Sequence, residues 1–211
     1  ENEKKKYRFF KVLNLSNFWI FGWGAIGIIF VSGDIVKLCF GEKYILDMSI
    51  PFILALNFYI VGMQNAVYTY KNTMGLFRYG QYILLITASI NLVLDIILGK
   101  TMGIFGIYLA SAIARLLTNI WYEPYAVFKY GLKVSSFHYL KKYIGYAIVL
   151  CVTGGICCFL CNLCQFYIVV NVLLKFAICS IVPNIIFYVC YHKTDEGKYL
   201  IEIIKSVLRK I

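Results

Sequence analysis

Long apolar stretches, separated by short polar connections, fill most of this 211-residue chain. A helix needs about 20 predominantly apolar residues to cross a bilayer core about 30 Å thick. The apolar runs are continuous rather than alternating, which predicts membrane-spanning helices and not the strands of a barrel. The six predicted spans are residues 12–32, 48–70, 82–98, 104–121, 143–163 and 167–190.

The short connections predict helical hairpins. Residues 33–47 are expected to form a loop of mixed charge, and residues 99–103 a tight turn between the third and fourth spans. The longest connector, residues 126–142, divides the chain into a four-helix part (1–125) and a part with the last two spans (126–211). The expected fold is therefore an all-α polytopic membrane protein with six transmembrane helices.

The C-terminal residues show a different pattern, in which apolar and basic positions separate around a helix. The apolar positions are Leu200, Ile203, Ile204, Val207, Leu208 and Ile211. The basic positions are Lys198, Lys205, Arg209 and Lys210. This spacing predicts an amphipathic helix that lies on the inner leaflet. A helix packed against the inner ends of the bundle is the alternative.

Composition and charge support a lipid environment. The chain is 61% hydrophobic and 15% charged, whereas soluble domains contain about 25% charged residues. Of the 21 Lys and Arg, sixteen fall on the predicted side that holds both termini, and three (Lys37, Lys43 and Lys100) fall on the other. This asymmetry places both termini in the cytoplasm. Anionic lipid accounts for the net charge of +11 without a nucleic-acid partner.

Arg115 is the main candidate for a functional residue within the predicted spans. An ionisable residue costs at least about 2.5 kcal/mol near the bilayer centre and tends to face a cavity or a partner. A guanidinium stays protonated and binds phosphate bidentately, so Arg115 is a candidate contact for an anionic substrate. Snorkelling to the headgroups is the alternative. Gly103, Gly106, Ala110 and Ala114 form a separate stripe suited to close helix packing.

Asp95 is the acidic candidate inside a span, and Thr87 and Asn91 precede it at intervals of four residues. This spacing predicts a polar stripe on one helix face. Asn91 is a further candidate contact for the substrate. Asp95 is expected to form an ion pair near Lys100, and the alternative is a site for a coupling cation or proton.

Amides in the second span and a lysine in the sixth complete the set of candidates. Gln64 and Asn65 are candidate contacts for a sugar-rich solute, or else donors of interhelical hydrogen bonds. Lys175 is a weaker candidate for the substrate path, and snorkelling to the interface is its alternative.

Catalysis and metal binding find little support in the sequence. Four cysteines, Cys157, Cys158, Cys161 and Cys164, are spaced like metal ligands, but they lie in an apolar stretch without flanking acids or His. Free Cys behaves as a small hydrophobe, so we expect helix packing there and no metal. No Ser-His-Asp or Cys-His pattern emerges. Neither a cofactor nor enzyme activity is expected.

Three segments resemble a known family. "NLSNFWIFGWGAIG" (14–27), "YTYKNTMGLFRYGQY" (68–82) and "INLVLDIILGKTMGIFGIYLASAIARLLTNIWYEPYAVFKYGL" (90–132) resemble the C-terminal half of O-antigen and capsular polysaccharide repeat-unit flippases. These proteins form the polysaccharide-transport branch of the multidrug/oligosaccharidyl-lipid/polysaccharide exporter superfamily. The last two spans match mainly in hydropathy.

The resemblance implies a bacterial inner-membrane transporter with a second, N-terminal lobe. Such proteins move an undecaprenyl-diphosphate-linked glycan from the inner to the outer leaflet by alternating access. A cationic central cavity holds the substrate, and the resemblance implies by position that Arg115 is one of its residues. The opening at Glu1 is expected to lie partway through a longer protein, with the N-terminal lobe as a partner. The alternatives are a multidrug/cation antiporter of the same superfamily, a membrane enzyme and a noncatalytic membrane scaffold.

Overall fold

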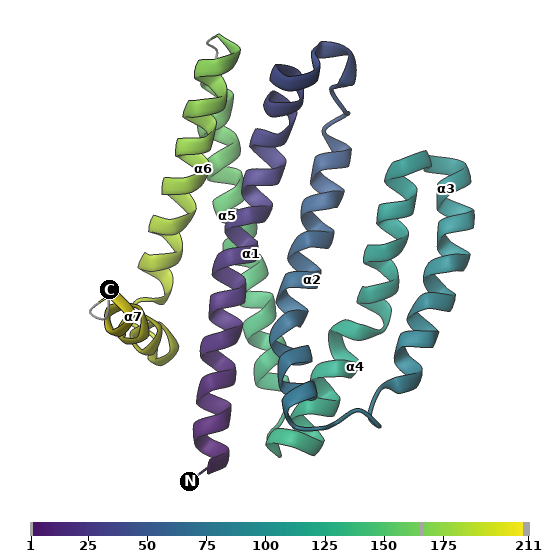
Figure 1. The fold of residues 1–211 in the computed structure, drawn as a ribbon, viewed down its shortest axis with the longest axis vertical. Coiled ribbons are helices and arrows are strands. Elements are labelled where there is room, and N and C mark those ends of the chain that lie inside the picture. The colour runs from purple at the N-terminus through teal and green to yellow at the C-terminus, as the bar shows by residue number, and fades with distance from the viewer. Residues whose placement is uncertain (1, 165–166, 209–211) are drawn as a thin grey trace.

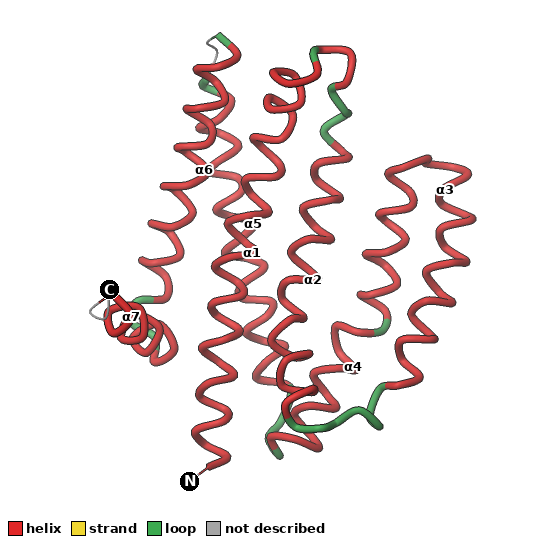
Figure 2. Tube along the Cα trace, in the orientation of Figure 1, coloured by secondary structure: helices red, strands yellow, loops and turns green. Residues whose placement is uncertain are grey.

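The computed structural model describes residues 2–164 and 167–208, and over these residues the chain is helical without strands. Figure 1 shows long helices side by side, with connections at the two ends of the bundle, and Figure 2 shows how little of the chain is loop. The α-helices are α1 (Asn2–Phe40), α2 (Ser49–Thr73), α3 (Gln81–Leu117), α4 (Asn119–Ala126), α5 (Phe137–Asn162), α6 (Ile168–Tyr191) and α7 (Asp195–Leu208). A 3-10 turn, η1 (Glu42–Tyr44), and a π-helix, η2 (Val127–Leu132), complete the described elements.

Helices long and apolar enough to cross a membrane make up most of the fold. Among the described residues there are five such helical segments, which indicate a multi-pass membrane protein. They are Lys5–Phe40, Ser49–Thr73, Gln81–Leu132, Phe137–Asn162 and Ile168–Tyr191. The all-helical prediction is confirmed. The third segment contains both the third and the fourth predicted span.

Helix α3 is a hairpin whose turn lies at Gly103, within the predicted turn at 99–103. Gly103 has φ 60° and ψ −138°, a conformation open to glycine but not to residues with a Cβ. The chain reverses direction there (Figure 1), which gives a first leg, residues 81–102, and a second leg, residues 104–117. The legs approach closely, because a Cβ at Gly106 would lie 2.1 Å from the Leu98 carbonyl oxygen.

The predicted packing stripe on the second leg is confirmed beyond the turn. Gly106, Ala110 and Ala114 are buried, together with Ala112. Ala112 packs with Ile53 and Ile60 of α2, which attaches the hairpin to the rest of the bundle.

The main apolar core lies between α1, α2, α5 and α6. Phe18 of α1 is fully buried and packs against Tyr146 and Phe187, with ring centroids 4.6 Å apart in both pairs. Cys157 and Cys179 lie in the same core, where they act as small apolar side chains.

Helix α1 is longer than predicted, so the expectation of a loop over residues 33–47 is wrong for its first part. The helix continues to Phe40 because the residues after Asp34, Ile-Val-Lys-Leu-Cys-Phe, are compatible with a helix. Its 39 residues span about 58 Å, well beyond one bilayer core. This extension places Asp34 on a helix rather than in a loop.

The predicted connector at 126–142 is also mostly helical. η2 continues α4 to Leu132, and α5 begins at Phe137. Val127 and Phe128 are buried against Phe10 of α1. The burial of these apolar residues explains why the segment folds instead of forming an open loop.

The first leg of α3 carries extensive exposed apolar surface. Large exposed side chains on it are Tyr82, Leu84, Leu85, Ile86, Leu92, Val93, Ile96 and Ile97. Exposed apolar surface of this extent is typical of elements that contact lipid or another protein.

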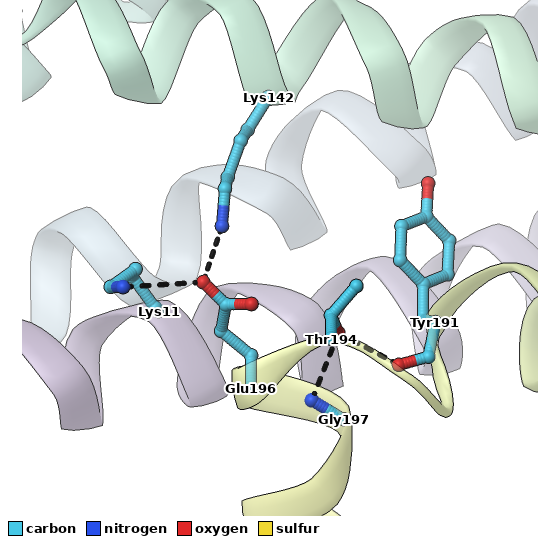
Figure 3. A network of polar contacts seen from close by, with 6 residues as sticks. All are labelled: Lys11, Lys142, Tyr191, Thr194, Glu196 and Gly197. Carbon is cyan, nitrogen blue, oxygen red and sulfur yellow. Dashed lines mark hydrogen bonds and ion pairs between the residues drawn. The ribbon is translucent and has the colours of Figure 1, made fainter.

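Helix α7 is fixed to the bundle through Glu196, whose side chain is only 8% exposed (Figure 3). The Glu196 carboxylate pairs with Lys142 of α5 and lies 3.4 Å from Lys11 Nζ of α1. Thr194 Oγ1 accepts a hydrogen bond of 3.1 Å from the Gly197 amide and so covers the start of α7. Helix α7 therefore packs against the bundle, which is the alternative predicted from the sequence to a helix lying on the inner leaflet.

The outer face of this helix is described only in part. The side chains of Ile204, Val207 and Leu208, and all of residues 209–211, lie outside the described residues. The prediction that this apolar face contacts the inner leaflet stays a prediction.

Replacing Glu196 with Gln should release α7 from the bundle. Burial raises the pKa of Glu196, but the hydrogen bond from Lys142 and the charges of Lys142 and Lys11 outweigh it and lower the pKa overall. The stabilisation is therefore present above the ordinary carboxyl range and is lost as pH falls through the lowered pKa. In hydrogen exchange, the amides of residues 195–208 should exchange at least about tenfold faster in the variant at pH 7. The exposed neighbour Glu202, changed to Gln, is the control, and equal protection in both variants would contradict the prediction.

Candidate functional site

Polar side chains gather where α2, both legs of α3 and α4 meet, at the end of the bundle that holds the N-terminus (Figure 1). We call this cluster the polar junction; its members are Tyr68, Lys71, Thr87, Thr118, Asn119 and Glu123. The junction forms because the helix breaks at Thr118, with φ −124° and ψ −75°. Thr118 Oγ1 donates to the Ala114 carbonyl at 2.6 Å, a local bond that competes with the helix ladder.

A buried ion pair holds one side of the polar junction. Lys71 Nζ lies 3.0 Å from Glu123 Oε1, to which it donates a hydrogen bond, and 2.9 Å from Oε2. Lys71 is 7% exposed and Glu123 is 1% exposed. The backbone at Gly80, directly before α3, covers the pair, since a Cβ at Gly80 would lie 2.9 Å from Lys71 Nζ.

Hydroxyl and amide groups form the other side of the polar junction. Thr87 Oγ1 lies 2.7 Å from Thr118 Oγ1 and 2.9 Å from Asn119 Oδ1. Asn119 Nδ2 donates to the Tyr68 hydroxyl at 3.1 Å. These bonds join the two legs of α3 to α2 and give each polar atom a partner in an apolar bundle.

Arg115 lies in the last turn of α3, three residues before the helix break at Thr118. Its side chain is partly buried, and its charge acts on the Tyr68 hydroxyl together with that of Glu123. Across residues 2–164 and 167–208, the guanidinium has neither a carboxylate within 4.0 Å nor a hydrogen-bond acceptor. Arg115 is therefore a partly buried cation without an ion-pair partner among the described residues.

Asp95 and Asn91 lie on the first leg of α3 and bond to each other. Asn91 Nδ2 donates to Asp95 Oδ2 at 2.7 Å. Asp95 Oδ1 is buried and has no hydrogen-bond partner among the described residues. The expected ion pair of Asp95 is wrong for the described residues, since no cation among them, Lys100 included, lies within 4.0 Å of its carboxylate.

Gln64 and Asn65 do not act together. Gln64 is 3% exposed, and its side-chain oxygen and nitrogen have no partner in the described part of the chain. Asn65 is exposed, and its backbone carbonyl accepts a hydrogen bond from Thr69. Neither amide joins the polar junction, although Tyr68, from the same helix, does.

Lys175 lies in another part of the bundle and is paired. Its Nζ lies 2.5 Å from Asp34 Oδ2, which joins α6 to α1 near the end that carries the α1–α2 connection. The structure therefore does not bring Lys175 and Arg115 into one site.

Several polar residues of these sites were not predicted from the sequence. Glu123 follows an aromatic run that is typical of the membrane–water interface. Lys71 lies just after the second predicted span, where a lysine in a connecting loop is expected. Their pairing spans 52 residues of sequence, so no local spacing signals it. An acidic residue inside a continuing helix, as at Glu123 and Asp34, is the signal that would have pointed to both pairs.

Comparison of the chain with models of protein families, with curated proteins and with solved structures yields no match.

Proposed function

We propose that this chain forms part of a bacterial lipid-linked oligosaccharide flippase, which moves undecaprenyl-diphosphate-linked repeat units from the inner to the outer leaflet. The observation that carries the proposal is Arg115, a partly buried cation without an anionic partner among the described residues. A guanidinium binds phosphate oxygens bidentately, and a diphosphate supplies the missing negative charge. A buried cation without a partner is costly, so such a ligand also relieves the site.

The neutral groups of the polar junction suit the sugar part of this substrate. Glycan hydroxyls cannot enter hydrocarbon without replacement of the hydrogen bonds that they make with water. Tyr68, Thr87 and Asn119 place hydroxyl and amide groups where α2, α3 and α4 meet, and the charge of Arg115 acts on the Tyr68 hydroxyl there. Exchange of their mutual hydrogen bonds for bonds to sugar hydroxyls keeps both partners satisfied.

The bundle is proposed to cross the cytoplasmic membrane six times, with each leg of α3 as a separate span. The end with the N-terminus, the polar junction and α7 faces the cytoplasm, because the cationic residues concentrate there. A second lobe, facing the polar junction, completes the passage, and rocking of one lobe against the other gives alternating access. The exposed apolar face of the first leg supplies the surface on which lipid or that lobe packs.

Transport in proteoliposomes tests the proposal. The protein from its whole reading frame is reconstituted with undecaprenyl-diphosphate-linked oligosaccharide, and movement of the glycan is followed with membrane-impermeant periodate. We expect the protected glycans to become accessible faster than in protein-free vesicles. Equal rates with and without the protein would contradict the flippase function.

A multidrug/cation antiporter is the second candidate, and Asp95 is the observation that favours it. A buried carboxylate oxygen without a hydrogen-bond partner is a ready acceptor for a proton or a cation. The two functions differ in what Asp95→Asn does. An antiporter loses cation-driven export of small cations, whereas a flippase that does not use Asp95 keeps glycan movement.

A further inference from the structure

Two adjoining hollows run along α1, α2 and α5, away from the polar junction. The first, about 440 Å³, is lined by apolar side chains that include Ile26, Phe52, Ala55, Leu150 and Gly155. The second, about 480 Å³, lies toward the α1–α2 connection and is lined by Asp34, Asp47, Asn162 and Lys175 among others. Each volume lies within the usual range of ligand pockets.

The two hollows form one groove, because Ile29, Phe30, Met48 and Cys158 line both of them. The groove is apolar at the depth of the spans and charged at one end of the bundle. This is the shape and polarity of an amphiphile that lies parallel to the helices, with its headgroup at the level of the α1–α2 connection.

The charges at the polar end select the headgroup. Two carboxylates, Asp34 and Asp47, accompany the single ammonium of Lys175, and the two members of the Asp34–Lys175 pair are each about one-fifth exposed. An ammonium group on the ligand complements the carboxylates, and a phosphate complements Lys175. A purely anionic headgroup would add negative charge to a site in which two carboxylates already outnumber the one lysine.

We infer that this groove binds a zwitterionic glycerophospholipid of the phosphatidylethanolamine type, with one acyl chain in the apolar part and the headgroup at Asp34, Asp47 and Lys175. The site is separate from Arg115 and does not depend on the proposed transport. Its occupant fills a hollow between three helices, so it stabilises the bundle as a bound ligand does.

Native mass spectrometry with defined lipids tests the inference on the whole chain. The unmodified protein should retain phosphatidylethanolamine in preference to phosphatidylglycerol. A Cβ at Gly155 meets no atom within 4 Å, so Gly155→Leu fills the apolar part without a backbone clash. We expect about tenfold less bound phosphatidylethanolamine, a change that the loss of two buried methylene groups suffices to produce. Gly145→Leu, on the same helix and also in open space but outside the groove, should bind as the unmodified protein does.

A second measurement needs no substitution. Cys158 lines both hollows and is exposed, whereas Cys190 is exposed outside the groove. Phosphatidylethanolamine should slow maleimide labelling of Cys158 relative to Cys190, and phosphatidylglycerol should not. Equal retention of the two lipids, undiminished binding by Gly155→Leu, or unprotected Cys158 would each overturn the inference.

Discussion

Replacing Arg115 with Gln should reduce glycan translocation by about tenfold to a hundredfold while the protein remains at normal levels in the membrane. The reduction corresponds to the loss of one charge-assisted hydrogen-bonded contact, worth about 1.5–3 kcal/mol. The guanidinium has no partner among the described residues, so its removal breaks no internal ion pair and should spare the fold. Surface glycan display in cells and movement in proteoliposomes are the two readouts.

The chemistry of the side chain decides how the variants rank. Arg115→Lys keeps the charge but loses the planar fork, so its activity should lie between those of the unmodified protein and Arg115→Gln. Arg78 is an exposed cation in the turn before α3, at the same end of the bundle, and Arg78→Gln is the matched control. Full translocation by Arg115→Gln, or an equal loss in Arg78→Gln, would remove Arg115 from the substrate path.

Replacing Glu123 with Gln should destabilise the protein by about 3–5 kcal/mol, the usual cost of leaving a buried charge without its partner. Lys71, which is 7% exposed, would then lose its carboxylate partner. The polar junction joins α2 to α4, so its loss should loosen the attachment of the α3 hairpin. Chemical denaturation of the purified protein in detergent measures the change.

Two further variants separate the effect of losing the Lys71–Glu123 ion pair from the effect of leaving Lys71 without its partner. In Lys71→Met with Glu123→Met, both partners are apolar, and the protein should recover most of the lost stability. Glu42→Gln removes an ion pair with Lys37 in which the Glu42 side chain is 76% exposed, and its effect on stability should be far smaller. If Glu123→Gln were no less stable than Glu42→Gln, the pair would have no structural role.

The sequence predicted the helical character of the chain because hydropathy and span length are local properties. The turn near Gly103 and the buried face of Gly106, Ala110 and Ala114 were also predictable, since small residues repeat there at helical spacing. The ends of the helices were less predictable. α1 passes through Gly33 and Asp34, because burial and pairing with another helix decide whether a polar residue ends a helix.

The candidate sites could be predicted only in part. Asn91 and Asp95 lie four residues apart, and their hydrogen bond follows from helix geometry. Lys175 pairs with Asp34 and Lys71 with Glu123 across the bundle, contacts that no spacing along the chain indicates. The burial of Gln64 and the exposure of Asn65 could not be predicted either, because the orientation of adjacent residues depends on how the helices pack.

The proposed placement of Arg115 beside the cytoplasm requires both legs of α3 to cross the bilayer. Thiol labelling of single cysteines introduced at the exposed residues Thr101 and Ser135, resolved from the native cysteines by peptide mass spectrometry, tests this requirement. With a membrane-impermeant maleimide on spheroplasts, Thr101→Cys should label at once, and Ser135→Cys only after permeabilisation. Labelling of both positions from the same side, or of Ser135→Cys alone from outside, would contradict the double crossing and the cytoplasmic position of the polar junction.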